Sequence, residues 1–178
     1  MILSEENMLD EAVIAAAKEL AIAAVTAPKA CGRDTIRTAV VTGEDLVTLA
    51  AEMDRIEEAR ESSFAIFSRD AALVRRSPAV VLIGVKNQSR GLHPCGLCGH
   101  GDCASCKKAG GHCAFDDMDL GIALGSAASR AADLRLDNRM LYTAGMAAMS
   151  LKLLGEEVST IVAIPLSCTN KNIYFDKK

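Results

Sequence analysis

The chain has 178 residues, half of them hydrophobic, and a formal net charge of −3. This length suits one domain with a buried core, and the hydrophobic content excludes a disordered chain. The small negative charge gives no electrostatic reason to expect nucleic acid or an anionic membrane as a partner. We therefore expect a single domain over residues 1–178 that binds neither nucleic acid nor membranes.

The beginning of the chain predicts a cytoplasmic protein. MILSEENMLDE has no basic stretch and no cleavable apolar stretch, so it does not resemble a signal peptide. The apolar run that follows, AVIAAAKELAIAAV, is interrupted by Lys18 and Glu19 and is a poor membrane span. In a reducing cytosol, clustered thiols indicate metal or redox chemistry more often than disulfides.

The first half of the chain alternates helices and strands. Residues 4–26 are predicted to form a helix that is capped by Ser4 and ended by Pro28, because apolar side chains recur there at helical period. The short β-branched run 36–41 predicts a strand. Two further helices are expected over 44–60 and 68–76. The continuous apolar run AVVLIGV (79–85) is typical of a strand covered on both faces.

The second half contains an insertion followed by two helices and a strand. Residues 86–115 are predicted to be a cysteine-rich, loop-rich insertion, because they show no hydrophobic periodicity and many glycines. A long helix rich in small residues is expected over 116–134, and another over 141–154 with Gly155 just past its end. Between them, the polar residues 137–139 are expected to cap the next helix or to line a cleft. With a last strand over 158–166, the order indicates an α/β or α+β fold.

The most informative segment is HPCGLCGHGDCASCKKAGGHC, in which five cysteines fall within nineteen residues. They are Cys95, Cys98, Cys103, Cys106 and Cys113, and all three histidines of the chain, His93, His100 and His112, lie among them. Thiolates brought so close repel one another unless a cation holds them, and the segment has few apolar residues that could bury them. The pattern predicts a metal site that folds around its metal.

An iron–sulfur cluster and a zinc ion are the two alternatives for this site. For a cluster, the expected ligands are Cys95, Cys98, Cys103 and Cys113, with Cys106 spare; the alternative set uses Cys106 and frees Cys113. Zinc ribbons usually separate their CxxC pairs by about 15–20 residues, whereas four residues lie between the pairs here. The spacing favours a cluster, and a mixed cysteine–histidine zinc site stays open. Each histidine is expected to be solvated or to support a ligand.

The motifs DLGIALGSA, DNRMLYTAG and TNKNIYFD, together with the cysteine segment, resemble the uncharacterised ferredoxin-domain proteins of prokaryotes over nearly the full length. The resemblance implies that the cysteines hold a [4Fe–4S] cluster. It does not imply a particular reaction.

A second resemblance concerns the fold. The stretches AIAAVTAPKACGRDTIRTAVVTGED, RRSPAVVLIGV and DMDLGIALGSAASRAADLRL are similar to a helix, Ala-Pro loop and strand, a second strand, and the central helix of nitroreductase-type flavoproteins. This implies a nitroreductase-like α+β fold, a homodimer, and FMN in a cleft between subunits. The Arg-x-Ser element and the Asn and Gln-Pro-Trp of that family are absent here. Lys29 and Arg33 either replace these FMN contacts or are solvated loop charges.

The sequence thus indicates an iron–sulfur protein for electron transfer, acting with a redox partner protein or as a flavin-dependent reductase of a small substrate. The alternative is a binding module without catalysis, in which zinc or a structural cluster fixes a loop. The residues do not decide whether the protein is an enzyme.

Overall fold

The computed structural model describes residues 2, 4–60 and 64–175. In this part of the chain, an antiparallel four-stranded sheet lies at the centre, with the order β1-β2-β4-β3. Its strands are β1 (Ile36–Thr42), β2 (Ala79–Lys86), β3 (Asp137–Asn138) and β4 (Val158–Ser167).

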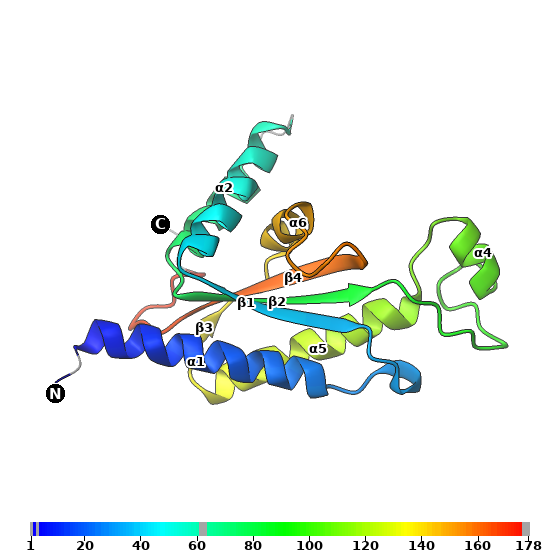
Figure 1. Cartoon of the computed structure of the whole chain (residues 1–178), viewed down its shortest axis with the longest axis horizontal. Helices are drawn as coiled ribbons and strands as arrows, with labels where there is room; N and C mark the ends of the chain where they lie inside the picture. The colour runs from blue at the N-terminus through cyan, green and yellow to red at the C-terminus, as the bar shows by residue number, and fades with distance from the viewer. Residues whose placement is uncertain (1, 3, 61–63, 176–178) are drawn as a thin grey trace.

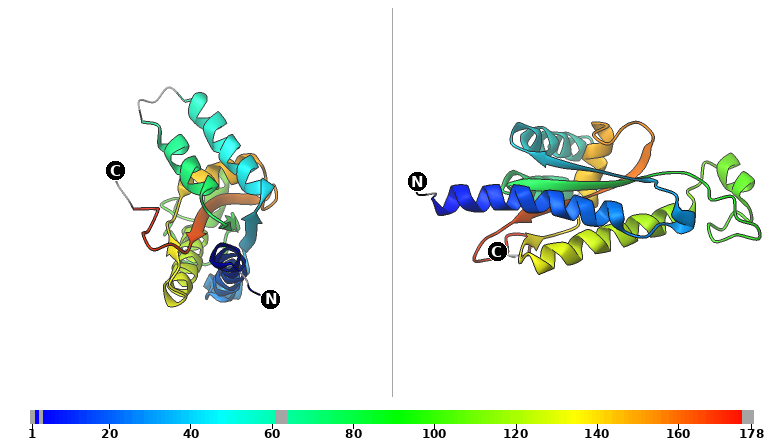
Figure 2. Two further views of the ribbon diagram at one scale, coloured as in Figure 1. Left: turned by 90° about the vertical axis from the view of Figure 1, so that its left-hand side faces the viewer. Right: turned by 60° about the horizontal axis from the view of Figure 1, so that its bottom comes forward.

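Helices cover both faces of the sheet, which makes three layers (Figure 1). The helices α1 (Glu5–Thr26) and α5 (Ala114–Asp133) run side by side on one face (Figure 2). The other face carries α2 (Glu44–Glu58), α3 (Ile66–Arg75) and α6 (Tyr142–Ser150). The short α4 (Cys103–Lys108) lies beyond the end of the sheet, and η1 (Ala30–Gly32) lies between α1 and β1. None of the helices described is long and apolar enough to cross a membrane.

The central strand β2 explains why the apolar run AVVLIGV has no polar alternation. Val81, Ile83 and Val85 point into the core beneath α1 and α5, whereas Val80 and Leu82 point into the core beneath α2, α3 and α6. Because β2 pairs with β1 on one edge and β4 on the other, its backbone is also covered. The predicted strand covered on both faces is confirmed.

Most of the predicted elements are present, and their ends differ by a few residues. α1 is capped as predicted, because the Ser4 hydroxyl accepts a hydrogen bond from the amide of Asn7 at 3.4 Å. α5 begins two residues earlier than predicted, and the predicted loop contains the six-residue helix α4. The α+β class is confirmed.

The predicted end of α6 is wrong. The helix stops at Ser150, because Lys152 adopts a left-handed φ of 54° and the amide of Leu153 bonds back to the carbonyl of Ala148 at 3.0 Å. Gly155, predicted to end the helix, has a φ of 95° in the following turn. Lysine is unusual at such a position, so the sequence pattern pointed to the later glycine.

The polar residues 137–139 do not cap α6. Asp137 and Asn138 form β3 by pairing with the end of β4, and the residue before α6 is Leu141, whose side chain makes no capping hydrogen bond. Arg139 instead donates a hydrogen bond to the carbonyl of Tyr174 at 2.9 Å and stacks on the ring of Phe175. These residues hold the C-terminal segment against the end of the sheet.

Tyr174 anchors that segment. Its side chain is buried, and its hydroxyl shares a 2.8 Å hydrogen bond with the Ser77 hydroxyl. Burial raises the pKa of the Tyr174 phenol to about 12, from an ordinary value of 10.0. The folded state therefore holds the phenol neutral at pH values where an unfolded chain would ionise it.

Replacing Tyr174 by Phe should remove part of the alkaline destabilisation. The pKa is raised on folding, so this group's contribution is complete below pH 10 and is lost as the pH rises from 10 to 12. Over that window the wild type should lose up to about 1.4 kcal/mol per pH unit more than the Tyr174→Phe variant. Urea unfolding between pH 8 and 11.5 measures this, with Tyr142→Phe, at an exposed tyrosine, as the control. Equal losses in wild type and Tyr174→Phe would contradict the assignment.

Candidate metal centre

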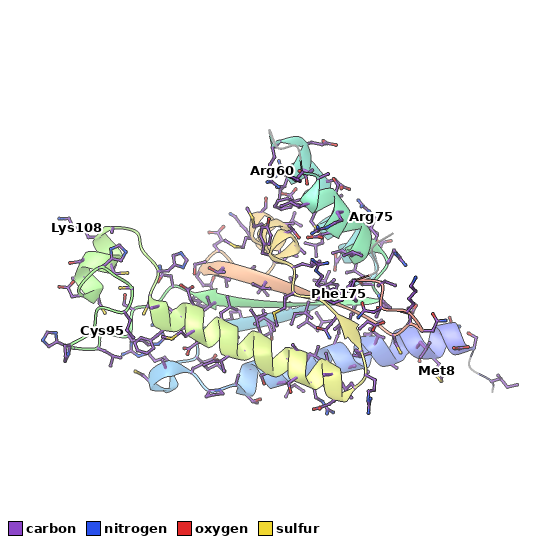
Figure 3. All side chains as sticks on the ribbon, turned by 180° about the vertical axis from the view of Figure 1, so that it is seen from behind. Met8, Arg60, Arg75, Cys95, Lys108 and Phe175 are labelled. Atoms are coloured by element: carbon purple, nitrogen blue, oxygen red, sulfur yellow. The ribbon has the colours of Figure 1, made fainter. Side chains whose placement is uncertain are left out.

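The five clustered cysteines line one small pocket. It lies in the loop that projects beyond the sheet, where Figure 3 labels Cys95 and, at the tip, Lys108. The other residues of the wall are Ser89, Gly96, Leu97, Asp102, Ala114 and Phe115. The loop therefore brings together every cysteine that the sequence analysis selected.

Three local structures present these cysteines. Cys98 lies in a tight turn, closed by the amide of Gly99 on the carbonyl of Gly96 at 2.9 Å, and Cys95 immediately precedes this turn. Cys103 and Cys106 lie three residues apart on α4 and so share one helix face. Cys113 is the residue immediately before α5, and its carbonyl accepts the amide of Asp116.

The cysteines differ in exposure. Cys106 is 2% exposed and Cys113 is 8% exposed, whereas Cys95, Cys98 and Cys103 are partly exposed. The Cys106 thiol donates to the carbonyl of His112 at 3.4 Å, and burial raises its pKa. All seven cysteines of the chain are free thiols. Cys106 therefore has a hydrogen-bond partner of its own, the backbone of His112.

Within residues 2, 4–60 and 64–175, no three Cys, His, Asp or Glu side chains are gathered closely enough to hold a metal ion. The sulfur atoms line the pocket as separate donors, and some of these side chains would have to rotate to bind a metal ion or a cluster. His93, His100 and His112 are exposed and are not part of the pocket wall. Four or more thiols around one pocket fit a cluster, since a cluster presents a separate metal corner to each thiolate.

A buried ion network ties this loop to the body of the protein. The guanidinium of Arg90, 1% exposed, pairs with Asp116 at 2.7 Å and with Asp119 at 2.6 Å. Both carboxylates lie on the buried face of α5, and Arg90 also donates to Thr35 and to the carbonyl of Gln88. Burial disfavours its charged form, but Asp119 and Asp116 raise the pKa of Arg90 above its ordinary value. Arg90 therefore stays charged.

Sequence reasoning missed this network. Arg90 is one basic residue in an irregular loop, and nothing in its sequence neighbourhood marks it as buried. A signal was present on α5, because Asp116 and Asp119 lie on the same helix face as the apolar residues Leu120 and Ala123. Two acidic residues on a buried helix face indicate a buried cation or hydrogen-bond donors nearby.

The predicted flavin-phosphate residues already have partners. The Lys29 ammonium donates to the carbonyls of Val25 and Ala27, at the end of α1, and Arg33 donates to the carbonyl of Ser89 at 3.0 Å. Lys29 borders a second, mainly apolar hollow beside α5, and Arg33 does not. Phe115 lies in the wall of both this hollow and the cysteine pocket. The hollow offers an apolar wall for a flat ring, but neither cation is free for a phosphate.

The three-layer arrangement defines the chain as a nitroreductase-like α+β protein. It superposes with a TM-score of 0.60 on a nitroreductase with bound FMN from Desulfitobacterium hafniense, at 19% identity over 96% of this chain and 81% of that one. A putative nitroreductase in complex with FMN from Desulfovibrio desulfuricans gives a TM-score of 0.58 at 15% identity, over 100% of this chain and 81% of that chain. At these identities the likeness shows the fold alone.

The sequence relatives are more specific. Residues 109–177 match the family model described as "Uncharacterized protein containing a ferredoxin domain (DUF2148)". An uncharacterised protein of Archaeoglobus fulgidus is 40% identical over 99% of this chain and 98% of its own length. The chain therefore belongs to this family of ferredoxin-domain proteins, as its motifs predicted.

Proposed function

We propose that the protein is a cytoplasmic electron-transfer protein that carries a [4Fe–4S] cluster in the loop at residues 86–115, an insertion into a single domain. Membership in a ferredoxin-domain family supports a redox role. The observation that carries the proposal is the convergence of five cysteines on one pocket. When bound, the cluster would accept and release one electron at a time.

The proposed ligands are Cys95, Cys98, Cys103 and Cys113. Cys106 is the alternative, and its hydrogen bond to the carbonyl of His112 supports its assignment as the spare thiol. The chain's own part is to hold the thiolates and to restrict water, since Ala114 and Phe115 supply an apolar wall.

Metal analysis of protein purified without oxygen tests the proposal. We expect about four iron and four acid-labile sulfide per chain, and a broad visible absorption that bleaches with dithionite. One zinc per chain without iron would contradict it. That result would instead favour the alternative, a zinc-stapled binding module without catalysis.

FMN binding is a secondary proposal. The hollow that shares Phe115 with the cysteine pocket supports it, because a flat ring there would lie next to the cluster. Because Lys29 and Arg33 are bound to backbone carbonyls, they would have to change partners to hold the phosphate. Flavin fluorescence in an acid extract of the purified protein would establish it, and an extract without flavin would remove the reductase from consideration.

We also propose a homodimer, with a redox partner protein docking near the cysteine loop. α1 and α5 expose the apolar side chains of Ile22, Val25, Met118 and Ile122, as expected of helices that pack against another subunit. Light scattering at micromolar concentration should give twice the mass of the chain, and a monomer would contradict this assignment.

A further inference from the structure

The cysteine loop leaves β2 through residues 87–90, the outgoing arm, and returns to α5 through residues 111–113, the returning arm. We call the place where these two arms meet the neck. We propose that Arg90 is a positioning residue that locks this neck, so that the loop keeps its cysteines around one pocket before any metal binds. The inference concerns the metal site of the proposed function. It differs from the sequence-based expectation that the segment folds around its metal.

The outgoing arm is bonded directly to the returning arm. The Asn87 side chain donates to the carbonyl of Gly111 at 2.9 Å and accepts the amide of Cys113 at 3.3 Å. One residue further, the amide of Gln88 donates to Asp116 at 2.7 Å. These three contacts fix the position of Cys113 relative to the start of the loop, and none of them involves a metal ligand side chain.

Arg90 provides the charge that keeps this arrangement closed. Without it, Asp116 and Asp119 would be two buried carboxylates with no cation, and water would have to enter the neck to solvate them. Opening the neck would separate Cys113 from the CxxC turn, because the outgoing arm would no longer follow α5.

The same network reaches the loop after α1. The Asp119 carboxylate, which binds Arg90, also accepts the amide of Ala30 at 2.9 and 3.1 Å. Arg33 donates to the carbonyl of Ser89 on the outgoing arm. The neck is therefore braced from the Ala-Pro loop as well as from α5, and its geometry belongs to the body of the protein.

Thiol labelling of metal-free protein tests this inference. In wild type, Cys106 and Cys113 should react with iodoacetamide at least about tenfold more slowly than the exposed Cys31, because the closed neck keeps them buried. In the Arg90→Met variant both rates should approach that of Cys31. Hydrogen exchange at the amides of Gln88 and Cys113 should accelerate in parallel.

Three further variants guard against general unfolding. Arg130→Met removes an exposed arginine from the other end of α5, where it pairs with Glu19, and should leave the labelling unchanged. Arg90→Lys keeps the charge and should restore part of the protection. Arg90→Met with Asp116→Asn and Asp119→Asn removes the unpaired charge and keeps acceptors for the amides of Gln88 and Ala30, so it should fold. It also lacks both ion pairs that tie the outgoing arm to α5, so it should still label faster than wild type.

Two results would overturn the inference. One is unchanged labelling in the folded triple variant or in Arg90→Met. The other is metal-free wild type in which Cys106 and Cys113 react as fast as Cys31. Because both measurements use metal-free protein, they are independent of whether the bound metal is an iron–sulfur cluster. A positive labelling result combined with zinc in the purified protein would support the neck and reject the proposed function.

Discussion

The Cys98→Ser substitution should remove most of the visible absorption of the anaerobically purified protein. Cys98 is one of two cysteines on the CGLC turn, and it lines the pocket together with the four other thiols. Its loss should lower iron and sulfide content by at least about tenfold, since removal of groups that merely support a ligand already costs 10–100-fold in metal affinity. Iron, sulfide and absorbance per chain are the measurements.

Cys31 and Cys168 provide matched controls. Both are free thiols outside the pocket wall, Cys31 in the loop after α1 and Cys168 just after β4. Serine at either position should leave the iron content at the wild-type level. If Cys98→Ser also kept its iron and sulfide, the pocket would not be the cluster site.

The same series decides between the two ligand sets. Cys113→Ser should lose the cluster and Cys106→Ser should retain it, because the Cys106 thiol already donates to the His112 carbonyl. The reverse pattern would make Cys106 the fourth ligand and Cys113 the spare.

The Gly145→Ala substitution should be the most destabilising of the glycine-to-alanine changes in the described chain. Gly145 lies in α6 where the helix meets β4, and a Cβ atom there would come within 1.9 Å of the carbonyl oxygen of Ile161 and 2.7 Å of its carbon. Both atoms belong to a strand backbone that pairs with β2, so they cannot move aside locally. We expect a loss of about 3 kcal/mol in the free energy of unfolding, at the upper end for overpacking.

Gly125 provides the control for Gly145. It also lies inside a helix, α5, but a Cβ atom there would meet nothing within 4 Å. Gly125→Ala should therefore raise stability by about 0.5–1 kcal/mol, the usual gain of alanine over glycine in a helix. Urea unfolding followed by circular dichroism measures both. A Gly145→Ala variant as stable as wild type would mean that α6 packs less closely on β4 than described here.

The predictable parts of the fold were those with a continuous local signal. The apolar run of β2 and the capped, periodic α1 have such signals, and both lie where the sequence placed them. The end of α6 at Ser150 and the two-residue β3 depend on how the chain meets β4. No local pattern encodes that contact.

The candidate site also has a part that the sequence predicted and a part that it did not. The five cysteines were visible from their density, and they do share a pocket. The contact between Cys106 and the backbone of His112 was not predicted. Nor was the pairing of Arg90 with two carboxylates about one helical turn apart on α5. Both are contacts between segments, and no local pattern in the sequence encodes them.

The outgoing arm of the cysteine loop begins where β2 ends, and this has a consequence for how the protein opens. β2 is paired along both edges and buried on both faces, so its amides should exchange with solvent only on global unfolding. A fluctuation that frees the arm would therefore stop at Lys86 and leave the sheet intact. The cysteine loop can then open and close many times within the lifetime of one folded molecule.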